Sequence, residues 1–174
     1  MKSIIISTFG GLGKTTFAKD HPDLAIDIEG IPYKYIYKNI SHEDLLEADH
    51  EKYKGVPDRN INPQFPHNYV AKIRESIGKY KFILIVLAPD VLTELDRLGL
   101  EYIILYPNLN DKDVILDRLK KRGNNEAFIK KIDNILSNSD ELEYIKARLR
   151  PKRLIELGRN EYVGDWIKKY LSKS

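Results

Sequence analysis

Apolar residues follow two kinds of pattern along the chain, namely short uninterrupted runs and positions three or four residues apart. Five runs rich in β-branched and aromatic residues predict strands, at residues 3–7, 24–28, 82–87, 102–106 and 153–157. Helical spacing predicts helices at residues 14–19, 69–79, 111–121, 126–136 and 165–171. Strands that alternate with helices indicate right-handed crossovers and a parallel sheet covered by helices on both faces.

The third run, residues 82–87, is apolar without alternation, which is typical of a central parallel strand buried on both faces. We expect this strand to lie next to the first one. Between the second and third strands, residues 30–68 form a long excursion with several tyrosines and a proline-rich stretch. Such an excursion in a compact domain is usually functional. Because no repeat, linker or low-complexity tract interrupts the pattern, residues 1–174 predict a single domain.

The composition then excludes several classes of protein. The chain is 42% hydrophobic and 32% charged, and no apolar run approaches the roughly 20 residues of a membrane span. We expect no signal peptide, no membrane partner and a cytoplasmic location. Zero cysteines exclude disulfides, thiolate zinc sites and a catalytic thiol. A net charge of +3, from 29 basic and 26 acidic residues, does not indicate a nucleic-acid binder.

A glycine-rich loop follows the first strand and opens the first helix, which is where a phosphate-binding loop lies. Glycines let consecutive backbone N–H groups turn toward one anion, and the helix N-terminus adds positive potential. Lys14 is expected to reach the outer phosphates, and the Thr15 hydroxyl to ligate Mg²⁺. The residues predicted to bind the phosphates of the nucleotide are Gly10, Gly11, Leu12, Gly13, Lys14, Thr15 and Thr16.

The match to the phosphate-loop pattern GxxxxGK[ST] has one departure, because Thr8 takes the place of the first glycine. A β-branched residue has less backbone freedom than glycine at such a turn. The alternative interpretation is an incidental glycine-rich turn with an exposed lysine. Strand, loop, Gly-Lys-Thr-Thr and helix all agree, so phosphate binding is the favoured interpretation.

Acidic residues at strand ends are the candidates for metal binding. The third strand runs into Ala88-Pro-Asp90, and we interpret Asp90 as the N-cap of a helix that starts near Val91, with a turn toward the metal as the alternative. The second strand ends at Asp27 and Glu29, at the edge where open α/β sheets bind ligands. Asp27, ahead of Glu29, is predicted to orient Mg²⁺ or to accept a proton. The alternative is an exposed acidic turn.

Two arginines lie four residues apart on the helix that ends at Gly123, so Arg118 and Arg122 share one face. Phosphoryl transfer needs cations that meet the charge of the transferred group, and a mobile segment that carries arginines supplies them. We therefore predict a lid at about residues 107–126. The alternative is a solvated basic face near a helix C-terminus, which needs no ligand.

Aromatic and basic residues of the excursion and of the helix after it are candidates for binding an acceptor. They can stack on a base and pair with a phosphate, and they are Tyr33, Lys34, Tyr35, Arg59 and Arg74. The tyrosines at 33, 35 and 37 equally fit one face of a short strand. Gly158 and Arg159, after the last strand, are weaker candidates for contacts to adenine, with an ordinary turn as the alternative.

The order of these parts resembles the nucleoside monophosphate kinase group of P-loop proteins, and more closely the short nucleotide-kinase-like proteins of bacteriophages of Gram-positive bacteria. The resemblance covers most of the chain and rests on residues 10–16, 27–29, 33, 62–66, 68–69, 106–118 and 122–125. It implies an α/β, three-layer P-loop NTPase fold with five parallel strands ordered 2-3-1-4-5. It also implies an acceptor-binding insertion at about residues 30–68 and a short lid after the fourth strand.

The resemblance further implies an enzyme that uses ATP and Mg²⁺ to phosphorylate a nucleoside or deoxynucleoside monophosphate. Lys14 and Thr15 would hold phosphates and Mg²⁺, Arg118 and Arg122 would close over the transferred group, and Asp27 or Glu29 would face the acceptor. One alternative is a kinase for another acceptor, namely a nucleoside, a small metabolite or a polynucleotide 5′ end. The other is a nucleotide-binding regulatory module without turnover. The expected partners are nucleotides, with a monomer or homodimer as the assembly and a host cytoplasm for a phage protein.

Overall fold

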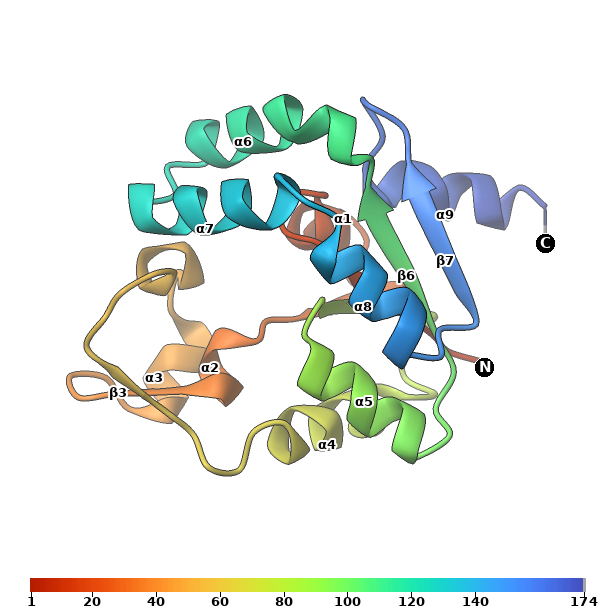
Figure 1. Ribbon diagram of the computed structural model, residues 1–174. Coiled ribbons are helices and arrows are strands. Elements are labelled where there is room, and N and C mark those ends of the chain that lie inside the picture. Colours follow the sequence, from red (N-terminus) through yellow and green to blue (C-terminus); the bar gives the residue numbers. More distant parts are fainter. Residues whose placement is uncertain (174) are drawn as a thin grey trace.

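The computed structural model describes residues 1–173 and contains a sheet of five parallel strands (Figure 1). The strands are β1 (Ile4–Thr8), β2 (Ala25–Ile28), β5 (Phe82–Val86), β6 (Tyr102–Pro107) and β7 (Arg153–Leu157). Their order across the sheet is β2-β5-β1-β6-β7. Counted within this sheet, the order is 2-3-1-4-5, so the predicted α/β fold class and strand order are confirmed.

The apolar run that predicted a central strand forms β5, which pairs with both β1 and β2. Four successive side chains of β5, Phe82 to Ile85, are 0% exposed because helices cover both faces of the sheet. Burying one such side chain contributes about 1.5–3 kcal/mol to the free energy of folding. This burial fixes the carboxyl ends of β1, β2 and β5 next to one another.

Seven longer helices surround the sheet: α1 (Lys14–Asp20), α4 (His67–Ser76), α5 (Pro89–Arg97), α6 (Lys112–Lys121), α7 (Glu126–Leu136), α8 (Asp140–Arg148) and α9 (Val163–Leu171). The helix α1 packs beside α9, and α4 packs beside α5. Figure 1 shows α6 and α7 running together above the carboxyl ends of the strands. Within the described residues, no helix has both the length and the apolar character to cross a membrane.

The insertion, residues 30–68, folds into short elements of its own: α2 (Ile31–Lys34), β3 (Tyr35–Tyr37), α3 (His42–Glu47), a 3-10 turn (His50–Tyr53) and β4 (Arg59–Ile61). The strands β3 and β4 are antiparallel. A small apolar cluster of Ile31, Tyr37 and Leu45 holds these elements together. Tyr35 and Tyr37 therefore belong to a short strand, as the alternative interpretation of the tyrosines had it, whereas Tyr33 lies in the helix α2.

Two local predictions are wrong. Asp90 is not an N-cap, because α5 begins at Pro89 and Asp90 lies inside the first turn without a capping bond from its side chain. The helix predicted to continue to residue 79 ends at Ser76, since Ile77 is extended and Gly78 has a φ of 85°. Val70 and Ile73 are buried, but Ile77, which has the same helical spacing, is 41% exposed.

Candidate functional site

The glycine-rich loop, residues 9–16, joins β1 to α1 and is anchored to the core from both ends. The Leu12 side chain is 1% exposed, and its carbonyl accepts a hydrogen bond from the Val163 N–H at 2.9 Å. Gly11 and Gly13 have φ values of 80° and 84°, which residues other than glycine rarely adopt. A Cβ at Gly13 would also lie 3.0 Å from the Tyr162 ring. The loop therefore depends on glycine at these two positions.

The departure at Thr8 causes no strain. Thr8 is still the last residue of the extended strand β1, and no described residue other than glycine has a positive φ. Its side chain is 1% exposed, and its hydroxyl donates to the Phe9 carbonyl at 3.2 Å. The position therefore suits a β-branched strand residue, and the conformational freedom of glycine is not needed here.

Thr15 joins the loop to the carboxyl end of β2, where the two acidic residues Asp27 and Glu29 lie. The Thr15 hydroxyl lies 2.6 Å from Asp27 Oδ2 and 3.3 Å from Glu29 Oε1. Burial raises the pKa of Asp27 above its ordinary value, nearby Lys14 lowers it, and Glu29 raises it. The three side chains therefore form one polar cluster beside Lys14.

The other oxygen of Asp27, Oδ1, is buried and has no hydrogen-bond partner within the described residues. A buried carboxylate oxygen without a partner is costly, so a bound cation would stabilise this arrangement. Asp27, Glu29 and the Thr15 hydroxyl offer the hard oxygen ligands that Mg²⁺ prefers. Residues 1–173 contain no cluster of three or more His, Cys, Asp or Glu suited to a metal.

A cavity of about 350 Å³ opens beside this cluster, at the carboxyl ends of β1 and β5. Its volume falls in the range of small-molecule sites. Six cationic side chains line it: Lys14, Lys34, Lys54, Arg59, Arg122 and Lys131. Three acidic side chains also line it: Glu29, Asp90 and Glu141. The excess of positive charge suits an anionic ligand.

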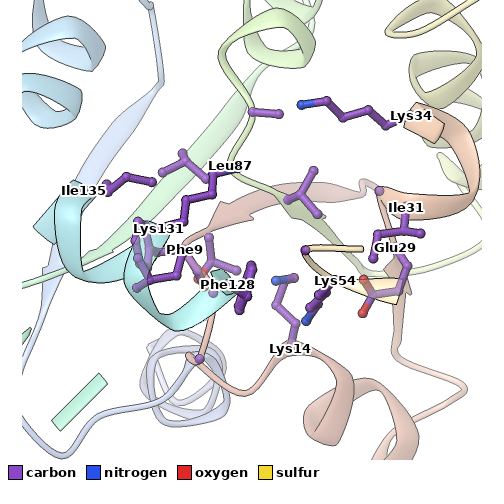
Figure 2. Close-up of a pocket in the computed structure, with 18 of the residues that line it drawn as sticks. Phe9, Lys14, Glu29, Ile31, Lys34, Lys54, Leu87, Phe128, Lys131 and Ile135 are labelled. Carbon is purple, nitrogen blue, oxygen red and sulfur yellow. The ribbon is translucent and has the colours of Figure 1, made fainter. Parts of the chain in front are cut away.

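The walls of the cavity differ in character (Figure 2). Phe9, Leu87, Phe128 and Ile135 lie toward one side together with Lys131, while Lys14, Lys54, Glu29 and Ile31 lie toward the other. A ligand with a charged part and a flat apolar part fits such an arrangement, because each part meets a wall of its own kind.

Most residues of the glycine-rich loop reach this cavity. Gly10, Gly11, Gly13, Lys14 and Thr15 line it. The other two predicted residues do not, because the Leu12 side chain is packed in the core and Thr16 is exposed on the first turn of α1.

The two lid arginines are not brought together. Arg122 lines the cavity at the end of α6. Arg118 turns away from it, with its guanidinium 3.9 Å from the centre of the Tyr162 ring and donating to the Arg159 carbonyl at 3.2 Å. The Arg159 side chain pairs with Asp111 and Asp113, at 3.0 and 2.6 Å. Gly158 and Arg159 therefore lie with Arg118 outside the cavity.

Some of the predicted acceptor residues line the cavity and others lie outside it. Glu29 and Lys34 line the cavity, and so does Arg59, whose guanidinium stacks 3.7 Å from the centre of the Tyr35 ring. Tyr33 instead packs edge-on against Tyr69, with ring centres 5.4 Å apart.

Arg74 is exposed on α4 and does not line the cavity. Of the predicted acceptor residues, Glu29, Lys34, Tyr35 and Arg59 therefore line the cavity, whereas Tyr33 and Arg74 do not.

The lid touches the insertion through Glu51. The Glu51 carboxylate pairs with Arg122 at 3.0 Å and with Lys54 at 2.6 Å, and it accepts a hydrogen bond from the Asn124 side chain. The Asn125 side chain donates a hydrogen bond to the Lys54 carbonyl, which is a second contact between the lid and the insertion. Burial alone would raise the pKa of Glu51, but the Lys54 and Asn124 hydrogen bonds and Arg122 bring it below its ordinary value.

The cavity is also lined by residues that the sequence patterns did not single out, among them Lys54, Phe128, Lys131 and Glu141. Lys54 Nζ lies 5.4 Å from the centre of the Phe128 ring. Phe128 and Lys131 are three residues apart on α7 and therefore share one helix face. A search for a helix face that carries both an aromatic and a basic residue would have found them. Lys54 and Glu141 gave no such signal.

Comparison with protein-family models and with curated proteins finds no match. Among solved structures, an uncharacterized protein from Eubacterium ventriosum is similar, with 16% sequence identity and a TM-score of 0.41. The match covers 99% of this chain and 100% of that chain.

Proposed function

We propose that the protein transfers the γ-phosphoryl group of ATP to a nucleoside or deoxynucleoside monophosphate. The observation that carries this proposal is the shared cavity. Lys14 and Thr15 of the glycine-rich loop border the same space as Lys34 and Arg59 of the insertion. One side suits the phosphates of a donor and the other suits the phosphate of an acceptor.

The transfer breaks the bond between the γ-phosphorus and the bridging oxygen of ATP, and it forms a bond from an acceptor phosphate oxygen to that phosphorus. ADP leaves, and the acceptor becomes a diphosphate. Bound Mg²⁺ would neutralise charge on the phosphates. Catalysis then rests on positioning and on charge, because such transfers need little covalent chemistry from the protein.

Each side chain has a role that follows from its place. Lys14 meets the outer phosphates from the loop, and the Thr15 hydroxyl and Asp27 carboxylate hold the metal side of the donor. Arg122 reaches the transferred group once it leaves Glu51. Lys34 and Arg59 hold the acceptor phosphate on the insertion.

The test is ADP release from Mg-ATP, measured with each common ribo- and deoxyribonucleoside monophosphate in turn and with a blank that lacks acceptor. Stimulation by one or a few monophosphates supports the proposal and names the acceptor. A flat panel together with confirmed ATP binding contradicts it. The result would then favour a nucleoside, a small metabolite or a polynucleotide 5′ end as acceptor, or a nucleotide-binding regulatory module without turnover.

A further inference from the structure

The cavity extends beyond its phosphate-binding groups into an apolar chamber beneath α7. Phe9 follows β1, Leu87 follows β5, and Phe128, Ile132 and Ile135 come from α7. Figure 2 shows several of these side chains gathered on one side of the cavity. These five side chains are apolar and suit a flat ring, and Lys131 of α7, which also lines the cavity, lies among them.

One carboxyl group borders this apolar chamber. Glu141, in the first turn of α8, lines the cavity, and its Oε1 accepts a hydrogen bond from the Tyr106 hydroxyl at 3.0 Å. Tyr106 is 2% exposed and packs edge-on against Phe9, with ring centres 5.4 Å apart. The other oxygen, Oε2, forms no hydrogen bond or ion pair within residues 1–173. Glu141 therefore presents one fixed acceptor without a partner.

Glu141 is partly buried, and its surroundings act on its charge in opposite directions. Burial raises the pKa of Glu141, while the hydrogen bond from Tyr106 and the charge of Lys131 lower it. A carboxylate beside apolar walls is stabilised when a ligand N–H completes its hydrogen bonds.

The chamber opens into the same cavity as the acceptor-binding groups of the insertion. Lys34 and Arg59 of the insertion line the same space, whereas the loop at Gly158 and Arg159 does not line it. The base of a bound acceptor would reach the chamber while its phosphate stays near the lysines and arginines.

We infer that the chamber holds the acceptor base and that Glu141 recognises an exocyclic amino group on this base. The inference rests on the proposed function. An amino group donates a hydrogen bond to Oε2. A keto oxygen in the same place would face the carboxylate as a second acceptor, and both groups would lose their hydrogen bonds with water. The protein should therefore prefer cytosine over uracil and adenine over hypoxanthine, since each pair exchanges an amino group for a keto group.

The test compares binding of cytidine with uridine monophosphate, and of adenosine with inosine monophosphate, by calorimetry. The wild-type protein should bind the amino member at least about tenfold more tightly in the pair whose ring fits. In Glu141→Gln, the Tyr106 hydroxyl should hold the amide oxygen, so the amide NH₂ faces the chamber as a donor. The preference should then reverse toward the keto member.

Two further variants separate recognition from a structural effect. Glu143→Gln makes the same change of charge on an exposed residue of α8 and should keep the wild-type ratio. Adding Tyr106→Phe to Glu141→Gln frees the amide to turn either way, so the reversed preference should disappear.

Each outcome decides the inference. A lost or reversed preference in Glu141→Gln supports it. Equal ratios in wild type and Glu141→Gln, or a wild-type protein that does not prefer the amino member, overturn it while leaving monophosphate binding in place. If no monophosphate binds although ATP does, the proposed function itself fails, and the inference falls with it.

Discussion

The glycine-rich loop and the contact between the lid and the insertion both border the cavity, but different forces hold them. The loop is fixed by backbone geometry and burial, as the 1% exposure of Leu12 and its bond to Val163 show. The lid contact is held by partly exposed charges and by hydrogen bonds from the Asn124 and Asn125 side chains. Its Arg122 and Glu51 side chains are 36% and 25% exposed.

These two kinds of contact indicate which part of the site is preformed and which part can move. Buried packing holds the loop in place whether or not a ligand is bound. Ion pairs with such exposure contribute roughly 0–1 kcal/mol and weaken as salt rises. The ion pairs of the lid with the insertion can therefore break at small cost. Under the proposed function, an incoming phosphoryl group would compete with Glu51 for Arg122.

The largest effect should come from the fixed part. Lys14→Ala removes the one lysine of the loop, and we expect phosphate affinity and turnover to fall together, with kcat/KM lower by about a thousandfold. Titration with ATP and the ADP-release assay measure the two quantities. Lys19→Ala, an exposed lysine in the last turn of α1, is the matched control. Unchanged ATP affinity in Lys14→Ala would rule out the loop as the phosphate site.

Asp27→Asn should lower turnover by about a hundredfold, because the metal side of the donor loses its charge. The same variant should be more stable than wild type at neutral pH. Burial raises the pKa of Asp27, so the folded state favours the neutral form, and ionisation of Asp27 costs stability as the pH rises above the ordinary value of 3.8. The variant should therefore unfold at a higher temperature than wild type at neutral pH and show no advantage at low pH.

Thermal unfolding across this pH range measures the effect of Asp27→Asn. Asp23→Asn, at an exposed position just before β2, serves as the control and should show neither change. A variant that is less stable than wild type at neutral pH would argue against the penalty assigned to the buried carboxylate.

The movable part should give a smaller effect on the rate. Arg122→Ala should leave ATP affinity unchanged and lower the rate about tenfold, because its partly exposed guanidinium meets only the transferred group. Arg118→Ala should change the rate less, since Arg118 stacks on Tyr162 outside the cavity. Single-turnover rates at saturating ATP separate the two. An unchanged rate in Arg122→Ala would show that the lid assignment is wrong.

The sheet could be predicted because each strand is a short apolar run that can be recognised from its own residues alone. The approach of Thr15 to Asp27 followed from the same pattern, since the carboxyl ends of parallel strands meet at one edge. The helix α8 was missed because its residues are mostly exposed and only Ile145 is buried, so the sequence shows no apolar face. Glu141 was missed with it.

The separation of the arginines depends on packing that the sequence does not show. Ile115 and Leu119 of α6 lie against Gly11, where an added Cβ would be 3.6 and 3.4 Å from them. This contact sets the rotation of α6. Arg118 then faces the loop after β7, and Arg122 at the helix end faces the insertion. Sequence spacing places two arginines on one face, but it does not say which neighbour that face meets.

The smallest effect should come from Glu51→Gln, which removes the charge that holds Arg122 and Lys54. We expect the free energy of unfolding to fall by less than about 1 kcal/mol in low salt, and the difference from wild type to vanish in high salt. The lowered pKa of Glu51 means that its contribution is complete above the ordinary value of 4.5 and is lost as the pH falls through the folded-state pKa. Denaturant unfolding at two salt concentrations, with exposed Glu47→Gln as control, measures it. A difference that persists in high salt would mean that packing, rather than charge, joins the lid to the insertion.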